Sequence, residues 1–200
     1  MQIDPSIYVA HATFWGAFGL TRVILARSGR VRAGDTEAAP VSNEEQTAPF
    51  SRTLFGLHMV AFATMYAGIA CAVFSGHIPV WLPYQRTLGF LVITAGAALA
   101  VWALVYFRSW RFRAKLEKGH QLASGGPFRF FRHPIYMGLN LLALGSAVWI
   151  PTLIVWAGFV LMAIGSDLRG RSEEKLLSQA FGPLYRDYCA RTSRFIPGIY

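Results

Sequence analysis

Residues 135–164 read IYMGLNLLALGSAVWIPTLIVWAGFVLMAI, an apolar run of 30 residues without a charged side chain. A helix that crosses a membrane needs only about 20 apolar residues, so this run is too long for one span. Pro151 lies near its middle, and a proline removes a backbone donor and disfavours helix in the preceding residue. The run therefore predicts a hairpin of two short helices that bends at residues 149–151.

Three further apolar stretches reach the length of a membrane span, and all lie before the hairpin, at residues 7–25, 54–74 and 88–107. Hydrophobic residues make up 54% of the 200-residue chain and charged residues only 14%, whereas a soluble domain averages about 25% charged residues. We therefore expect an all-α integral membrane protein with five transmembrane helical segments, the last two forming the hairpin, and a cytoplasmic C-terminal helical tail.

Basic residues are concentrated on one side of this predicted topology. Of the 19 Lys and Arg residues, five lie in 22–52, seven in 107–133 and six in 166–200, whereas the loop 76–86 carries one. Because cytoplasmic loops are enriched in Lys and Arg, we expect the N-terminus outside and the C-terminus in the cytoplasm, in a bacterial inner membrane or the endoplasmic reticulum. The net charge of +9 then reflects orientation and attraction to membrane lipids, and we expect no nucleic-acid partner.

The polar segments predict the remaining organisation. The third helix is expected to continue beyond the membrane through Arg108–Lys118, and Ser172 is expected to cap a tail helix that ends at Gly182-Pro183. The two cysteines lie far apart without metal-ligand spacing, and we expect no metal site. The chain is thus one domain, with three helices and their loops in 1–112 and the chemistry in 113–200.

Three groups of polar residues meet on the predicted cytoplasmic side: HQLA at 120–123, RHPIY at 132–136, and Arg169 with Glu173. Each has a plain structural explanation when it is taken alone. The first is a solvated loop, and the second anchors a helix end among headgroups. The third is an i,i+4 ion pair of little energetic worth if it is exposed.

The order and spacing of these groups are more specific than any one of them. GPFRFFRHPIY at 126–136, followed by RGRSEEKLLSQAFGPLYRDYCARTSRFIP at 169–197, resembles the isoprenylcysteine carboxyl methyltransferase family. That family belongs to a wider group of membrane methyltransferases that includes phospholipid N-methyltransferases. The resemblance extends over roughly residues 113–197 and does not reach the first hundred residues.

The resemblance implies a site for S-adenosyl-L-methionine on the cytoplasmic side. It implies that Arg169 faces the acceptor and orients it. The positions that match the cofactor-binding residues of the family are His120, Gln121, Leu122, Ala123, Phe128, His133, Pro134, Ile135, Tyr136 and Glu173. Two positions depart from the family pattern, because Phe128 stands where tyrosine is usual and Arg113 where glutamine is usual.

The implied activity is methyl transfer to a lipidic or small apolar acceptor that enters from the membrane. The resemblance favours O-methylation of an isoprenylcysteine-like carboxylate, and N-methylation of a phospholipid amine or S-methylation of a small thiol uses the same chemistry. Two other classes stay open: an NADPH-dependent membrane reductase of the sterol type, and a non-catalytic membrane scaffold. Binding of S-adenosylmethionine, rather than of a nicotinamide cofactor, would distinguish a methyltransferase from both of these classes.

Overall fold

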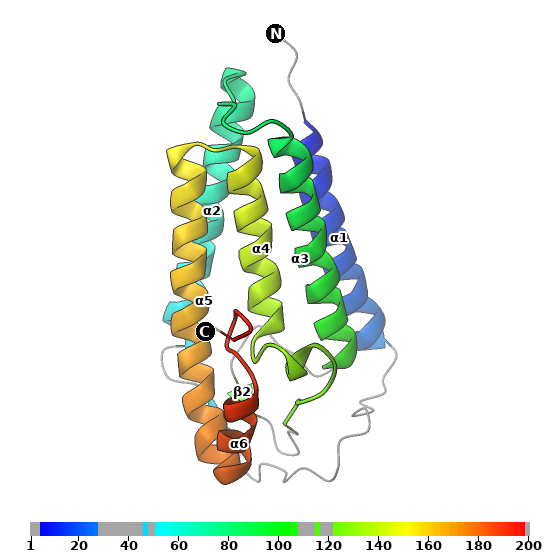
Figure 1. Cartoon of the computed structure of the whole chain (residues 1–200), viewed down its shortest axis with the longest axis vertical. Helices are drawn as coiled ribbons and strands as arrows, with labels where there is room; N and C mark the ends of the chain where they lie inside the picture. Colours follow the sequence, from blue (N-terminus) through cyan, green and yellow to red (C-terminus); the bar gives the residue numbers. More distant parts are fainter. Residues whose placement is uncertain (1–4, 28–45, 48–50, 108–114, 117–121, 199–200) are drawn as a thin grey trace.

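The computed structural model describes residues 5–27, 46–47, 51–107, 115–116 and 122–198. Over these ranges the chain is a helical bundle, so the expected all-α class is confirmed apart from one pair of two-residue strands (Figure 1). The helices are α1 (Ser6–Arg27), α2 (Ser51–Ser75), α3 (Gln85–Tyr106), α4 (Pro134–Trp149), α5 (Leu153–Phe181) and α6 (Pro183–Arg191), with a 3-10 turn η1 (Gly126–Arg129) and antiparallel strands β1 (Gln46–Thr47) and β2 (Lys115–Leu116).

Four of these helices, α1, α2, α3 and α5, are long and apolar enough to cross a membrane. The predicted bend is confirmed, because α4 ends at Trp149 and α5 begins at Leu153 on the other side of Pro151. Only α4 is short, however, because α5 has 29 residues and continues to Phe181. With 16 residues, α4 is about 24 Å long, less than the roughly 30 Å of a hydrocarbon core. The structure therefore supports four spans by length and one shorter apolar helix, so the expected count of five transmembrane segments is confirmed for four of them.

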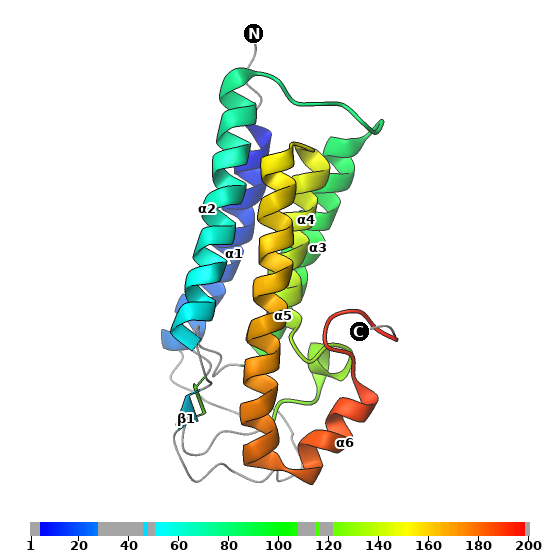
Figure 2. The ribbon, with the colours of Figure 1, turned by 90° about the vertical axis from the view of Figure 1, so that its left-hand side faces the viewer.

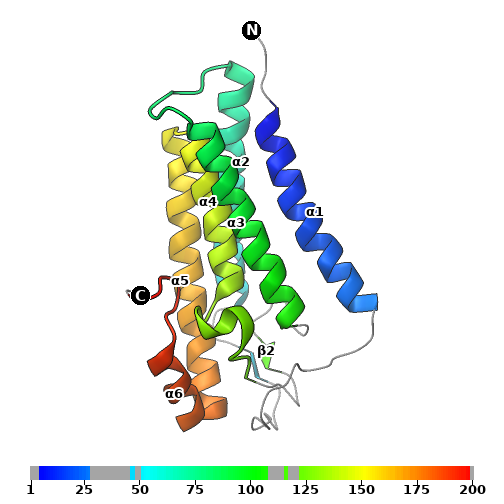
Figure 3. The same cartoon turned by 45° about the vertical axis from the view of Figure 1, so that its right-hand side comes forward.

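Successive helices run in opposite directions, so the ends of α1, α3 and α5 lie at the same end of the bundle as the starts of α2 and α4 (Figures 1 and 2). The helix α6 also lies at this end. The buried residues of α1 lie between Ile7 and Phe18, and the helix leans away from α4 and α5 towards its C-terminus (Figure 3). Accordingly Phe14 is buried in the core, whereas Val23 and Ile24 are exposed.

Glycines allow α3 and α4 to approach each other closely. A Cβ atom on Gly89 would lie 2.6 Å from the carbonyl oxygen of Gly145, and one on Gly96 would lie 2.7 Å from that of Gly138. Both relations are reciprocal, since Cβ atoms on Gly138 and Gly145 would meet the Gly96 and Gly89 carbonyl oxygens. Small residues at such crossings let helix backbones pack in a membrane, where the hydrophobic effect does not drive helices together.

Two expectations about helix ends are wrong. α3 ends at Tyr106 instead of continuing through Arg108–Lys118, and Lys115 lies in β2. The chain leaves the helix because the Phe107 ring packs against Phe128, with centroids 5.6 Å apart; residues 108–114 and 117–118 lie outside the described residues. Ser172 does not start a helix, because it lies within α5, which runs unbroken to Phe181.

The predicted break at Gly182-Pro183 is confirmed, with Gly182 at a positive φ of 52° and Pro183 in the first turn of α6. Tyr185 and Tyr188 of α6 are both buried. The Tyr188 hydroxyl donates to the carbonyl oxygen of Phe128 at 2.7 Å. The tail therefore folds against the segment that leads into α4.

Replacing Gly96 by alanine tests the close crossing of α3 and α4. The new methyl group would collide with the α4 backbone, so we expect Gly96→Ala to lower the free energy of unfolding by about 1–3 kcal/mol, the usual cost of overpacking. Gly16→Ala on α1 is the matched control, because a Cβ atom there meets nothing within 4 Å. Thermal unfolding in detergent measures both, and equal stability of the two variants would contradict the crossing.

Candidate active site

The segment that leads into α4 turns at two consecutive glycines, Gly125 and Gly126. Gly126 has a φ of 55°, a conformation that residues with a side chain rarely adopt. Cβ atoms on Gly125 and Gly126 would overlap the Tyr106 ring at the end of α3. The glycine pair therefore lets the chain turn tightly over Tyr106 and directs residues 131–136 along the polar end of the bundle.

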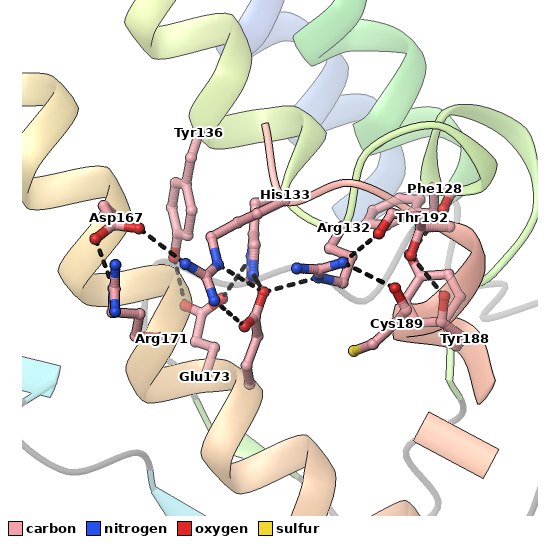
Figure 4. A network of polar contacts seen from close by, with 12 residues as sticks. Phe128, Arg132, His133, Tyr136, Asp167, Arg171, Glu173, Tyr188, Cys189 and Thr192 are labelled. Carbon is pink, nitrogen blue, oxygen red and sulfur yellow. Dashed lines mark hydrogen bonds and ion pairs between the residues drawn. The ribbon is translucent and has the colours of Figure 1, made fainter. Parts of the chain in front are cut away.

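Figure 4 shows a network of charged side chains at this end. Glu174 is its centre, because four of the hydrogen bonds end on its carboxylate. Its Oε1 atom accepts from Arg132 Nε at 2.9 Å, Arg194 Nε at 2.9 Å and His133 Nε2 at 3.2 Å, and its Oε2 accepts from Arg194 Nη2 at 2.6 Å. The side chains of Arg132, Glu174 and Arg194 are each only 13–14% exposed. One carboxylate thus joins the start of the hairpin, α5 and the C-terminal segment.

Backbone contacts hold the C-terminal segment in the same place. Phe131 and Ser193 form a parallel bridge, and the amide of Arg132 donates to the Ser193 carbonyl at 2.8 Å. The Arg132 guanidinium also donates to the carbonyl oxygens of Cys189 and Thr192. Arg132 therefore binds groups within the protein. This placement differs from the anchor among lipid headgroups that explained residues 132–136 when they were taken alone.

His133 lies between two adjacent carboxylates. Its Nδ1 is 3.6 Å from Glu173 Oε2 and its Nε2 is 3.2 Å from Glu174 Oε1. The imidazole stacks on the Tyr136 ring, with centroids 5.7 Å apart, and Gly170 leaves room for it on α5. Burial lowers the pKa of His133, but the two carboxylates outweigh it, so the pKa lies above its usual value.

Arg169, Tyr136 and Glu173 form the inner part of the site. The Tyr136 hydroxyl donates to Glu173 Oε1, and Arg169 Nε lies 3.5 Å from the same oxygen. The Arg169 guanidinium carbon is 5.3 Å from the Tyr136 ring centre and 5.9 Å from that of Phe55. Arg169 is only 2% exposed, and its Nε and Nη2 atoms make no hydrogen bond within the described residues.

The structure brings together His133, Tyr136, Arg169 and Glu173, four of the residues predicted for the site. Pro134 and Ile135 are buried in the first turn of α4. Phe128 lies on the Tyr188 side of the network in Figure 4, and its ring packs on Tyr106 and Phe107. Leu122 is buried in a separate apolar cluster with residues of α5 and α6, Ala123 is half-buried, and His120 and Gln121 lie outside the described residues.

Sequence reasoning missed the contributions of Glu174, Arg194 and α2. Glu174 falls in the first turn of the tail helix expected after Ser172, which gives it a local explanation, although two adjacent glutamates opposite Arg132 and His133 are a usable signal. Arg194 carried no signal beyond its charge. Phe55 could not be assigned from sequence, because nothing in an apolar helix indicates which residue covers a distant arginine.

The donor set of the site fits S-adenosylmethionine. Glu173 is a carboxylate that can accept from an ammonium or hydroxyl group, and its side chain is 21% exposed. Aromatic faces from Tyr136 and Phe55 suit a cation or a flat ring. Among the described residues, no group of three His, Cys, Asp or Glu side chains could hold a metal ion.

The raised pKa of His133 predicts how stability depends on pH. Protonated His133 pairs with Glu173 and Glu174, so its contribution is fully present below about pH 6.5, the ordinary histidine pKa, and is lost as the pH rises through the higher folded value. We therefore expect the difference in unfolding temperature between wild type and His133→Gln to shrink as the pH rises above about 6.5. A constant difference would indicate a neutral histidine. Thermal unfolding in detergent is the measurement.

Two curated proteins are similar in sequence to part of this chain. Two relatives are the "Cobalt-zinc-cadmium resistance protein CzcN" of Cupriavidus metallidurans, 29% identical over 58% of this chain, and the "Nickel-cobalt-cadmium resistance protein NccN" of Alcaligenes xylosoxydans xylosoxydans, 31% identical over 56%. These alignments cover 51% and 50% of the relatives, so the chain spans about half the length of the curated relatives it matches.

A family model described as "Phospholipid methyltransferase" matches residues 84–183, which include α3, α4, α5 and the site residues that lie on them. This match is to half of the chain and confirms the resemblance to the membrane methyltransferase group that the motifs around His133 and Arg169 predicted. The chain belongs to the phospholipid methyltransferase family.

Proposed function

We propose that the protein is an S-adenosylmethionine-dependent methyltransferase of the membrane, whose acceptor is an amphiphile with an anionic group. The observation that carries this proposal is the buried Arg169 guanidinium, which lies against the Tyr136 and Phe55 rings and whose Nε and Nη2 atoms make no hydrogen bond within the described residues. A buried donor without a partner is costly unless a ligand supplies the acceptor. A carboxylate or phosphate is the ligand group that best matches a guanidinium.

In this proposal, different residues of the chain bind the cofactor and the acceptor. Glu173, oriented by the Tyr136 hydroxyl and by His133, accepts hydrogen bonds from the cofactor. Bound S-adenosylmethionine supplies an electrophilic methyl group on a sulfonium. The remaining task of the protein is to align the acceptor and exclude water, which requires no general catalytic dyad.

The position of the site suits an acceptor from the membrane. Arg169 lies on α5, whose apolar first part is one of the candidate spans, and the charged network lies beside it at the polar end of the bundle. An isoprenylcysteine-like carboxylate would bind Arg169 directly. A phospholipid would bind through its phosphate, which leaves its amine as the methyl acceptor, and the family model favours this second candidate.

We also propose that the charged end of the bundle faces the cytoplasm, so that the N-terminus lies outside. The support is the distribution of charge, since 18 of the 19 Lys and Arg residues lie in segments that start or end at this end of the bundle. The soluble cofactor would then enter from the cytoplasm.

Calorimetric titration of the detergent-purified protein with S-adenosylhomocysteine tests the cofactor. We expect wild type to bind, and Glu173→Gln to bind at least about tenfold more weakly, because a hydrogen bond to a charged group contributes roughly 1.5–3 kcal/mol. Arg171→Gln is the matched control on the same helix, since the Arg171 side chain is 55% exposed. Failure of folded wild type to bind, together with binding of NADPH, would replace the proposal with the reductase reading.

Cysteine labelling in spheroplasts tests the topology. In a variant without Cys71 and Cys189, Val80→Cys places a thiol in the exposed α2–α3 connection, and Ala190→Cys places one at the exposed end of α6. We expect a membrane-impermeant maleimide to label Val80→Cys in intact spheroplasts and Ala190→Cys only after lysis. The reverse pattern would invert the proposed orientation.

A further inference from the structure

Two segments that are distant in sequence meet at the charged end of the bundle. They are residues 126–131, which lead into α4, and the C-terminal segment 192–198. Phe131 and Ser193 form a parallel bridge between them. The C-terminal segment lies beside the start of α4, on the outside of the bundle, whereas the last turns of α5 and most of α6 extend further from the membrane helices (Figure 2).

The end of α3 defines the level of this junction. The helix α3 is a candidate membrane span that ends at Tyr106. A Cβ atom on Gly126 would lie 2.5 Å from the Tyr106 ring, and the Phe128 ring packs against Phe107 with centroids 5.6 Å apart. Residues 126–130 therefore lie where an apolar span ends, which for a helix that crosses a membrane is the level of the lipid headgroups.

The inner side of the C-terminal segment is held by contacts within the protein. Arg194 donates through Nη1 to Asp167 Oδ1 at 3.1 Å and through Nη2 to Glu174 Oε2 at 2.6 Å. Phe195 is 7% exposed and packs against the His133 ring, with centroids 6.0 Å apart. These two side chains fix the direction of the segment, and the residues that follow them lie on its outer side.

The outer side of the junction is apolar and exposed. Phe130 is 48% exposed and Ile196 is 47% exposed, and Pro197 is exposed as well. The amide of Gly198 donates to the hydroxyl of Ser193 at 3.0 Å, which closes the turn that carries Ile196 and Pro197. The fold thus displays apolar side chains on a structured turn, although Arg194 and Phe195 of the same segment face inwards. Exposed apolar residues that are held in this way are typical of a contact surface.

The charge of the two segments is positive. Residues 126–133 and 192–198 contain three arginines and no acidic residue. Arg132 and Arg194 bind Glu174, whereas Arg129 is exposed and its guanidinium carbon lies 5.5 Å from the centre of the Phe130 ring. An arginine beside an exposed aromatic ring suits the headgroup layer, because the ring occupies the interface and the guanidinium binds a phosphate.

We propose that Arg129, Phe130, Ile196 and Pro197 form a surface that docks on the headgroup layer of the membrane, with Arg129 on the phosphate of an anionic lipid. The partner is a lipid surface because these residues lie at the level where a span ends and lipid surrounds the bundle. Their positive charge is also complementary to anionic headgroups. This proposal is independent of the proposed methyl transfer.

The docked surface would support the charged network from outside. Ile196 and Pro197 directly follow Arg194 and Phe195, so lipid contact on the outer side of the segment holds its inner side against Glu174 and His133. The C-terminal segment thereby connects the membrane surface to the residues of the site.

Fluorescence quenching in lipid nanodiscs tests the docking. A nitrobenzoxadiazole label is attached to Phe130→Cys, Ile196→Cys or Gln179→Cys in a variant without Cys71 and Cys189. Gln179 is the control, because it is exposed in the last turn of α5 beyond the junction (Figure 1). We expect a lipid with a nitroxide close to its headgroup to quench the first two labels, since docked side chains lie about 5–10 Å into the interface. Iodide in the water should quench the Gln179→Cys label instead.

A label at residue 130 or 196 that responds to iodide as strongly as the Gln179→Cys label would overturn the proposal. The labelled positions are exposed, so we expect each variant to keep the unfolding temperature of the parent without Cys71 and Cys189.

The role of Arg129 is tested by comparing nitroxide-labelled phosphatidylglycerol with nitroxide-labelled phosphatidylcholine at the same mole fraction, using the Phe130→Cys label. We expect a preference of roughly fivefold for the anionic lipid, since one basic residue near an anionic surface contributes about this factor. Arg129→Gln should abolish the preference, whereas Arg186→Gln, at an exposed position on α6, should retain it. Equal quenching by the two lipids, or a preference that Arg129→Gln does not change, would overturn the assignment of Arg129 to an anionic lipid.

Discussion

The site depends on one carboxylate, Glu174, which accepts hydrogen bonds from two arginines and a histidine. These partners come from the start of the hairpin and from the C-terminal segment, while Glu174 itself lies on α5. Breaking a mostly buried ion pair by removing one partner costs roughly 3–5 kcal/mol, because the other charge is left uncompensated. A bundle whose helices share only apolar faces would have no comparable reason to fold residues 192–198 back over the entrance to α4.

The hydrogen bonds of Glu174 determine which charged side chains remain available to bind a ligand. Glu174 satisfies Arg132 and Arg194, so the neighbouring Glu173 is left to Tyr136, His133 and Arg169. Arg169 then has donors in excess, since its Nε and Nη2 atoms make no hydrogen bond within the described residues. The two consecutive glutamates therefore have different roles. Glu174 joins the start of the hairpin to α5 and the C-terminal segment. Glu173 lies in the proposed site beside Arg169, whose Nε and Nη2 atoms have no hydrogen-bond acceptor within the described residues.

Much of this arrangement could be predicted from sequence where local rules apply. Pro151 predicted the bend of the hairpin, the i,i+4 spacing of Arg169 and Glu173 predicted their contact, and Gly182-Pro183 predicted the break before α6. Contacts between distant segments could not be predicted, because an apolar helix such as α2 gives no sign that Phe55 and His58 adjoin Arg169 and Tyr136. The end of α3 at Tyr106 was missed for the same reason, since ring packing against Phe128 overrides local helix propensity.

The central claim is that S-adenosylmethionine binds at the polar end of the bundle, between the start of α4 and the second half of α5. Ultraviolet cross-linking of the detergent-purified protein with methyl-tritiated S-adenosylmethionine, followed by peptide mapping, tests this claim most directly. The account predicts label on peptides that contain residues 122–136 or 169–174, and loss of that label when unlabelled S-adenosylhomocysteine competes. Label confined to the α2–α3 connection or to the first half of α1, or label that the competitor does not displace, would contradict it.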